Sequence, residues 1–530
     1  MHRWTIILGA LFIIWQWHPS GASAVIRDET NDAQTAFFDK EPIPTIRILL
    51  SEEAAAKLRA EPRQYVKAQF TENGKATFAN VGIKLKGQAG SFRGLDDRPA
   101  ITLHMTRYGG KARYHGLTKF HLNNSVQDES YLCEWICARM CLAAKVPTPR
   151  STHARVWLNG RDLGLYVLKE GFDKPFLSQF FTQVDGNLYD GGFLQDIDAP
   201  LNKESGNGPS EHRDLQELLA ACREADPVKR WQAIQTRLDV DAFISFMAME
   251  RLLCHWDGYT MNKNNYRIYF DPKTKKAHFF AHGMDQMFQD VNFPLLSLPP
   301  TIVGSAVLQN TAWRKQYRDR IKKLLPLFKP ESLNRMVDAS LSRMQPVVDS
   351  LGKSFADAHA LRVRELRERL TARYAHVIAQ MKQPDPSPLE FDTKGEATLN
   401  EWFAEQTSDT TLEEVTQEGK TLCLIRVGPS GDCVSSWRQR VMLAKGKYRV
   451  ELKMKAEGVE PRKDAQGEGA GLRISGSQRQ NKLIGNQDWQ TVTYDFEVLD
   501  ELREIVFVAE LRATKGTLLL ESTARLVRLN

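Results

Sequence analysis

Four polar side chains between residues 251 and 288 have types and spacing that suit chemistry. His255, Asp257 and Asn262 follow the order H-x-D-x-x-x-x-N, and Asp285 comes after a second hydrophobic strand further along. A carboxylate such as that of Asp285 and an amide oxygen such as that of Asn262 are ligands that suit Mg²⁺ or Mn²⁺. A second carboxylate, Asp257, can orient an attacking hydroxyl group. The residue types therefore predict a phosphoryl-transfer site.

The spacing of these residues has both a catalytic and a purely structural explanation. H-x-D-x-x-x-x-N is the spacing of the catalytic loop of protein kinases. Helical periodicity over residues 239–253 places His255 at the C-terminal end of a helix, and strands at 266–270 and 278–280 place Asp285 just after the second of them. Asp257 and Asn262 can equally cap a turn after that helix. Both interpretations stay open at this point.

Composition defines the broad class of the protein. The chain has 530 residues, 42% of them hydrophobic, which predicts about two to four domains with packed cores. The net charge of +7 is spread along the chain and gives no reason to expect nucleic acid. Seven cysteines are few for a disulfide scaffold. Cys423 and Cys433 flank a predicted turn and can pair across it, and the sequence leaves that pairing open.

The N-terminus carries the pattern of an export signal. Residues 1–24 contain Arg3, the apolar run ILGALFIIW and a small-residue ending at Gly21–Ala24. No later segment has the roughly 20 apolar residues that a membrane span needs. We expect an exported protein that does not span a membrane, in the periplasm, on the cell surface or outside the cell.

The segment before the catalytic-type motif reads as an antiparallel sheet followed by a helix and a hairpin. Strands are predicted at 43–50 and 65–86, and the second leads into Gly87, Gln88, Gly90 and Ser91, whose backbone N–H groups can cradle phosphates. An ordinary hairpin turn explains this loop as well. A further strand starts at Arg98, a helix follows Asp128, and Asn159-Gly160 joins two more strands.

Several motifs in this order resemble the CotH kinase family, the spore-coat-protein-H-like secreted atypical kinases. The resemblance covers about residues 43–381 through IKLKGQAGSF, GLTKFHLNNSVQDES, VWLNGRDLGLYVLKEGFD, GNLYDGG, HWDGYTMNKNNY and HGMDQMF. It implies a two-lobed kinase-like fold, the use of ATP with Mg²⁺ or Mn²⁺, and phosphorylation of secreted or surface proteins.

Carried over residue by residue, the resemblance implies a set of site residues. The catalytic loop would contain His255 and Asp257, the metal would be held by Asn262 and Asp285, and the nucleotide would contact Lys86, Gly87, Gln88, Gly90, Ser91, Arg98 and the hinge residue Glu170. One departure concerns Arg98, which stands where the family carries a phosphate-binding lysine, and arginine does not replace lysine there without consequence. Lys86 or Lys119 can supply that charge instead. Glu129 and Glu134 are both candidates for the helix partner of the lysine.

A second domain is predicted after the proline-rich segment 384–390. Short alternating strands from residue 391 onward predict a β-sandwich. It resembles jelly-roll carbohydrate-binding modules in WRQRVML followed by GKYRVEL, and in GLRISG. Trp437 and Trp489 can stack on sugar rings, although tryptophan in a small sandwich is more often part of the core.

The sequence thus predicts an α+β protein, a two-lobed protein-kinase-like domain followed by an all-β jelly-roll sandwich. The expected boundaries are a signal peptide at 1–24, an N-lobe with one helix at 43–170, a mainly helical C-lobe at 171–383, a linker at 384–390 and the sandwich at 391–530. The expected activity is transfer of the ATP γ-phosphoryl group to Ser/Thr-type hydroxyls of exported or surface proteins, with glycan as a further partner of the sandwich. The alternative is a pseudokinase, that is, a non-catalytic adhesion or glycan-binding protein that keeps the kinase-like fold.

Overall fold

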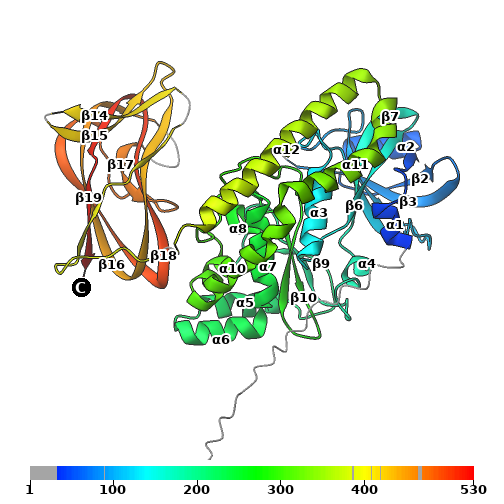
Figure 1. The fold of residues 1–530 in the computed structure, drawn as a ribbon, viewed down its shortest axis with the longest axis horizontal. Helices are drawn as coiled ribbons and strands as arrows, with labels where there is room; N and C mark the ends of the chain where they lie inside the picture. Colours follow the sequence, from blue (N-terminus) through cyan, green and yellow to red (C-terminus); the bar gives the residue numbers. More distant parts are fainter. Residues whose placement is uncertain are drawn as a thin grey trace, which may run out of the picture.

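The computed structural model describes residues 33–88, 90–384, 387–406, 409–417, 419–462 and 468–529. Figure 1 shows a mixed helical and stranded part, coloured blue to yellow-green, and an all-β part, coloured yellow to red. The predicted combination of these two kinds of structure is confirmed. The predicted signal peptide lies outside the described residues.

The first strands form a closed seven-stranded barrel in the order β1-β2-β3-β4-β5-β7-β6. They are β1 (Thr45–Leu49), β2 (Val66–Glu72), β3 (Ala76–Lys86), β4 (Ala100–His104), β5 (Lys119–Asn123), β6 (Ser151–Leu158) and β7 (Arg161–Glu170). The expectation of a purely antiparallel sheet is wrong at one place, because β1 pairs in parallel with β6. This pairing joins the two edges of the sheet and leaves no edge strand exposed.

Three helices accompany the barrel, where the sequence analysis expected one. They are α1 (Ala33–Asp39), α2 (Glu52–Ala60) and α3 (Cys133–Ala143). Helix α2 begins after Ser51, whose side chain accepts a hydrogen bond from the backbone N–H of Ala54 at 3.2 Å. That cap, followed by two acidic residues, is a local sequence signal for the start of a helix.

The next part combines a small sheet with helices. The sheet has the order β11-β10-β8-β9, formed by β8 (Leu188–Asp190), β9 (Asn202–Ser205), β10 (Tyr266–Phe270) and β11 (Ala277–Ala281). The helices are α4 (Lys174–Leu177), α5 (Arg213–Arg223), α6 (Pro227–Arg237), α7 (Val240–Leu252), α8 (Tyr259–Asn262), α9 (Ile302–Leu308), α10 (Thr311–Leu324), the 3₁₀ helix η2 (Leu325–Phe328), α11 (Pro330–Ser350) and α12 (Lys353–Met381).

Helix α3 connects the barrel to the helical part. It contacts both β6 and α11, and Figure 1 shows it beside them. Trp135 and Ile136 of α3 are buried in the same hydrophobic cluster as Ile244 and Phe246 of α7. The position of α3 is therefore tied to α7, the helix that leads into the H-x-D motif.

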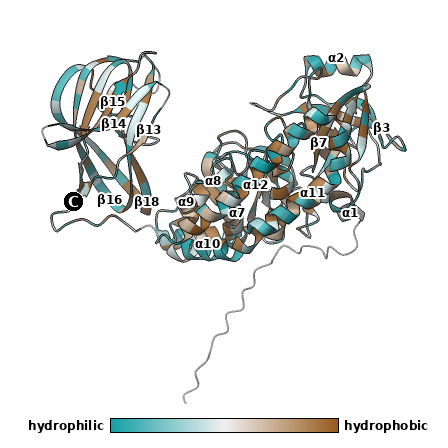
Figure 2. Ribbon diagram, turned by 45° about the horizontal axis from the view of Figure 1, so that its top comes forward, coloured by the Kyte–Doolittle hydropathy of each residue, from teal (hydrophilic) through white to brown (hydrophobic). Residues whose placement is uncertain are grey.

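The C-terminal part is an eight-stranded sheet that curls around its own core. Its strands are β12 (Glu396–Leu399), β13 (Phe403–Glu405), β14 (Thr410–Gln417), β15 (Lys420–Val427), β16 (Cys433–Pro461), β17 (Gly469–Ile474), β18 (Gly485–Glu521) and β19 (Ala524–Leu529). Figure 2 shows both hydrophobic and hydrophilic residues on β16 and β18, as expected for strands with one buried face.

The two cysteines of this part are not paired with each other. Cys423 and Cys433 are buried free thiols. Cys423 lies opposite Leu520 of β18, whereas Cys433 lies opposite Ala513. Seven residues of one strand correspond to roughly 20 Å, far beyond the span of a disulfide.

Candidate active site

Four charged side chains gather where the barrel faces the small sheet. They are Lys86 at the end of β3, Glu134 on α3, Lys169 on β7 and Asp285 after β11. The Lys169 ammonium lies 2.7 Å from a Glu134 carboxylate oxygen, and both side chains are less than one-tenth exposed. Asn123 of β5 accepts a hydrogen bond from Lys86 and donates one to Glu134. Strands β3, β5 and β7 and helix α3 thus meet in one polar network.

The pKa values of Asp285 and Lys86 are shifted in this network. Burial raises the pKa of Asp285 to about 6, with help from the negative charge of Glu134, while Lys86 and Lys169 act in the opposite direction. Burial also lowers the pKa of Lys86 to about 8. Once ionised, the Asp285 carboxylate can hold a metal cation, which leaves the two ammonium groups for an anion.

Asp257 is held by three amide groups. Its Oδ1 accepts a hydrogen bond from Asn262 at 2.6 Å, and its Oδ2 accepts one from Asn264 at 2.9 Å and one from Asn265 at 2.8 Å. Each carboxylate oxygen has two lone pairs, so Oδ1 keeps one for a hydroxyl group. Because Asn262 donates through its nitrogen, its carbonyl oxygen is left for a cation.

Glu250 of α7 fixes the loop that carries these groups. Its carboxylate accepts the backbone N–H of Tyr259 at 3.0 Å and that of Thr260 at 2.8 Å, and only 1% of the residue is exposed. Burial raises the pKa of Glu250 to about 7. Gly258 is required by close approach, since a Cβ atom there would lie 2.5 Å from a Glu250 oxygen.

His255 connects this loop to the segment that carries Asp285. It is fully buried, and its Nε2–H donates to the backbone carbonyl of His282 at 2.9 Å. Burial lowers the pKa of His255 to about 4, so the ring is neutral at physiological pH. The structure gives His255 a holding role between the two segments, and its catalytic role stays a prediction.

Arg98 and Glu170 are engaged elsewhere. Arg98 donates to the Tyr131 hydroxyl at 2.7 Å and to the Leu165 carbonyl at 2.5 Å. The Glu170 carboxylate forms an ion pair with Arg150 at 2.7 Å. Arg98 and Glu170 are thus held by contacts within the protein, and nucleotide binding by either stays a prediction. The lysine that pairs with the helix glutamate is Lys169, at a position that sequence reasoning missed.

The loop at residues 87–92 is closed on itself. The backbone N–H groups of Ser91 and Phe92 donate to the Gln88 carbonyl at 2.9 and 3.0 Å, and that of Gln88 donates to the Ser91 hydroxyl at 3.2 Å. Gly87 and Gly90 adopt positive φ angles of 101° and 82°, which favour glycine. In this conformation two N–H groups of the expected phosphate cradle, those of Gln88 and Ser91, are already used, and phosphate binding by the loop stays a prediction.

Of the two candidate glutamates, Glu129 and Glu134, only Glu134 lies on α3. Glu134 pairs with Lys169, whereas Glu129 forms a surface ion pair with Arg362 at 2.6 Å. Sequence reasoning also missed Asn123, Asn264, Asn265 and Glu250. The run Asn262-Lys263-Asn264-Asn265 was the available signal, because closely spaced amides just after a carboxylate can fold back onto it.

The oxygen donors present fit a magnesium-type ion. Among the described residues there is no group of three or more His, Cys, Asp or Glu side chains arranged to hold a metal. Mg²⁺ commonly uses only one or two carboxylates and completes its shell with water and substrate phosphates. The Asp285 carboxylate and the Asn262 carbonyl oxygen match that requirement.

Comparisons with known proteins agree with these motifs. Invasin CotH2 of Rhizopus delemar is 23% identical over 295 residues, which cover 52% of this chain and 46% of the invasin. Inner spore coat protein H of Bacillus subtilis is 21% identical over 282 residues, covering 49% of this chain and 76% of that protein. This chain spans about half the length of the first curated relatives that it matches.

Solved structures match about a quarter of the chain. One is TmCBM61 in complex with β-1,4-galactotriose, at 16% identity and a TM-score of 0.19, covering 24% of this chain and 88% of that one. Another is a CBM4 structure, at 20% identity and a TM-score of 0.18, with the same coverage of each chain.

Two further findings concern the chain as a whole. No helix in the described part of the chain is long and apolar enough to cross a membrane. The family described as "CotH kinase protein" matches residues 100–377, more than half of the chain. This chain belongs to the CotH kinase protein family.

Proposed function

We propose that this protein transfers the γ-phosphoryl group of ATP, with Mg²⁺ or Mn²⁺, to Ser/Thr-type hydroxyl groups of exported or surface proteins. The observation that carries the proposal is the buried Glu134–Lys169 pair beside Asp285, close to a loop in which three amides hold Asp257. Helix glutamate paired with lysine, metal-binding aspartate and loop aspartate with asparagine are the parts that a kinase-like phosphotransferase requires.

Each residue has a distinct role in the proposed reaction. Lys169, oriented by Glu134, contacts phosphate oxygens, and Lys86 adds a second positive charge. The free lone pair on Asp257 Oδ1 accepts the proton of the acceptor hydroxyl group while the hydroxyl oxygen attacks phosphorus. When bound at Asp285 and Asn262, the metal ion supplies positive charge against the phosphate oxygens.

Phosphoryl transfer tests the proposal directly. The purified chain is incubated with ATP labelled at the γ-phosphate and a generic protein acceptor, beside Asp285→Asn and the control Asp290→Asn. Asp290 is an exposed carboxylate five residues further on. Label with the parent and the control, and none with Asp285→Asn, supports the proposal. No label with any of the three, and no rise of Tm with nucleotide, favours a non-catalytic surface protein.

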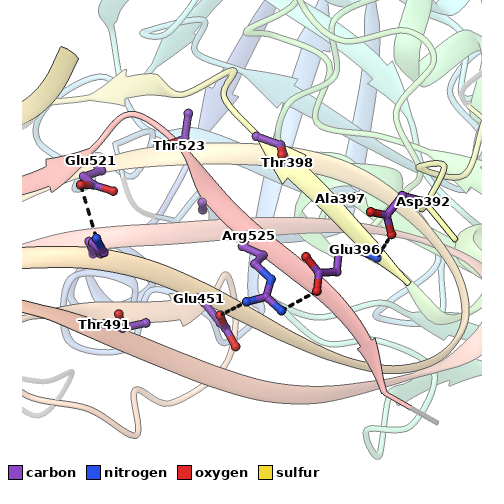
Figure 3. A pocket seen from close by; sticks show the side chains of 11 residues that line it. Asp392, Glu396, Ala397, Thr398, Glu451, Thr491, Glu521, Thr523 and Arg525 are labelled. Atoms are coloured by element: carbon purple, nitrogen blue, oxygen red, sulfur yellow. Dashed lines mark hydrogen bonds and ion pairs between the residues drawn. The ribbon is translucent and has the colours of Figure 1, made fainter. Parts of the chain in front are cut away.

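A second function, glycan binding, is favoured by a polar groove on the C-terminal sheet. The groove has a volume of about 570 Å³, and Figure 3 shows Arg525 between Glu396 and Glu451 at its centre. Arg525 lies 2.6 Å from Glu396 and 3.3 Å from Glu451. Thr491 also lines the groove, and Trp489, two residues earlier on β18, is 38% exposed.

Alternation along the strand places Trp489 and Thr491 on the same face. An exposed ring beside a row of hydrogen-bonding groups suits a sugar chain. Trp437, by contrast, is buried and donates its indole N–H to the Leu424 carbonyl at 3.1 Å, so it belongs to the core.

Pull-down of the full chain with insoluble polysaccharides tests the groove. Trp489→Ala is expected to reduce retention at least tenfold, while Phe403→Ala, which removes another exposed ring, is expected to leave it unchanged. Equal retention of both variants would contradict glycan binding at this site.

A further inference from the structure

The outer face of four barrel strands carries an unusual number of positive charges. Its lysines are Lys84 and Lys86 on β3, Lys119 on β5 and Lys169 on β7. Cross-strand pairing places Lys84, Thr102, His121 and Lys169 in one row, with His104 opposite Lys119 in the next. The alternate residues of the same strands, such as Ile83 and Phe120, are buried inside the barrel. All these polar groups therefore share one face.

The cations on this face form two groups, which we call the inner position and the outer position. The inner position, Lys86 and Lys169, is balanced by Glu134 and Asp285 and belongs to the site described above. The outer position consists of Lys84 and Lys119, joined by Arg107. Gly82 makes room for Arg107, since a Cβ atom at Gly82 would lie 2.6 Å from the Arg107 Cβ.

The outer position is only partly neutralised by the protein. The charged groups that act on Lys84 include Lys119, Arg63, Arg107 and Glu204, and Asp173 acts on Lys119. Glu204 is 3.4 Å from Arg267 and is shared with it, and Asp173 accepts hydrogen bonds from Thr118 and from the backbone N–H of Phe176. In the described part of the chain neither Lys84 nor Lys119 forms an ion pair. Half-buried like charges without a paired counterion are unfavourable, and a bound anion would relieve that cost.

The outer position is also a poor slot for a nucleobase. Such slots are lined mainly by apolar and aromatic side chains, whereas the row beside Lys84 consists of threonine, histidine and lysine. The Tyr65 ring next to this row is already covered by cations, since Lys84 and Arg107 lie 5.0 and 5.1 Å from its centroid. The backbone N–H groups next to it are occupied, because Glu170 donates to the Arg150 carbonyl at 2.9 Å and Gly171 donates to the Lys119 carbonyl at 3.0 Å. An anionic ligand fits this position better than a base does.

We infer that the outer position is a second anion site, and that the two positions together bind a linear chain of inorganic phosphate groups. Three strand intervals separate Lys84 from Lys169, about 14 Å, so a single phosphate group cannot reach both ends. The inference rests on the proposed function, because the inner position is its phosphate-binding part. It concerns binding, which can be measured without turnover.

Calorimetric titration of the full chain with pyrophosphate, tripolyphosphate, long-chain polyphosphate and ATP tests this inference. We expect long-chain polyphosphate to bind the parent at least tenfold more tightly than pyrophosphate. The variants Lys84→Met and Lys119→Met, made singly and together, keep most of the side-chain volume and are expected to remove this advantage while pyrophosphate binding is unchanged. The control Lys75→Met removes the same charge at an exposed position in the turn between β2 and β3 and is expected to have no effect.

Three results would overturn the inference. They are the absence of polyphosphate binding, affinity that does not depend on chain length, and equal weakening of pyrophosphate and ATP by the Lys84 and Lys119 variants. The last result would make the whole face one nucleotide site. A parent that binds polyphosphate but transfers no phosphoryl group from ATP would instead contradict the proposed function alone.

Discussion

Replacing Glu250 by glutamine should change how the stability of this protein depends on pH. Glu250 is buried and accepts the backbone N–H groups of Tyr259 and Thr260, which fixes the loop of Asp257. Glutamine has nearly the same shape but cannot ionise. The comparison therefore isolates the cost of holding a charge at this position.

The magnitude follows from the pKa of the group. Burial raises the pKa of Glu250 from 4.5 to about 7. A difference of about 2.5 in pKa corresponds to about 3 kcal/mol of unfolding free energy. A carboxyl group whose pKa is raised on folding contributes fully below its unfolded pKa and loses that contribution as the pH rises through its folded pKa. The parent should therefore lose about 3 kcal/mol relative to Glu250→Gln between pH 4.5 and pH 8.

Urea unfolding of both proteins at several pH values measures this difference. Other titrating groups and the C-terminal sandwich are common to both proteins and cancel in the comparison. The amide leaves one N–H without an acceptor, which adds a penalty of about 1–3 kcal/mol at every pH. The test is therefore how the difference in unfolding free energy changes with pH, not its value at one pH. A difference that stays constant from pH 4.5 to 8 would refute the reasoning.

Three other predictions concern the loop, the metal site and the cysteines. Gly258→Ala should destabilise the protein by about 1–3 kcal/mol in urea unfolding because its Cβ would meet Glu250, whereas Gly94→Ala, with open space around it, should have an effect within about 0.5 kcal/mol. Mn²⁺ binding followed by electron paramagnetic resonance should weaken as the pH falls through about 6, because Asp285 must be ionised to hold the ion. An affinity that is flat from pH 5 to 8 would contradict that role. Thiol titration after denaturation without reductant should count seven thiols, and five would indicate a disulfide.

The parts of the fold that the sequence predicted well depend on neighbouring residues. The Asn159-Gly160 turn joins β6 and β7 as expected, and α7 begins and ends within one residue of the predicted bounds 239–253. Asp257 and Asn262 are five residues apart, so the contact between them is also a local property. The Glu134–Lys169 pair joins residues 35 positions apart and requires both barrel closure and the packing of α3. No local pattern contains that information, which is why the sequence indicates Arg98, Lys86 and Lys119 as candidates but not Lys169.

The same network explains why a neutral residue occupies the end of β5. Asn123 lies between Lys86 and Glu134 and uses its carbonyl oxygen toward one and its amide nitrogen toward the other. A lysine there would be a third ammonium group beside Lys86 and Lys169, and burial already lowers the pKa of Lys86 to about 8. Added repulsion would lower that pKa further and remove the charge that the proposed phosphate contact needs. With the cations supplied by β3 and β7, an amide at position 123 can link Lys86 to Glu134 without adding charge.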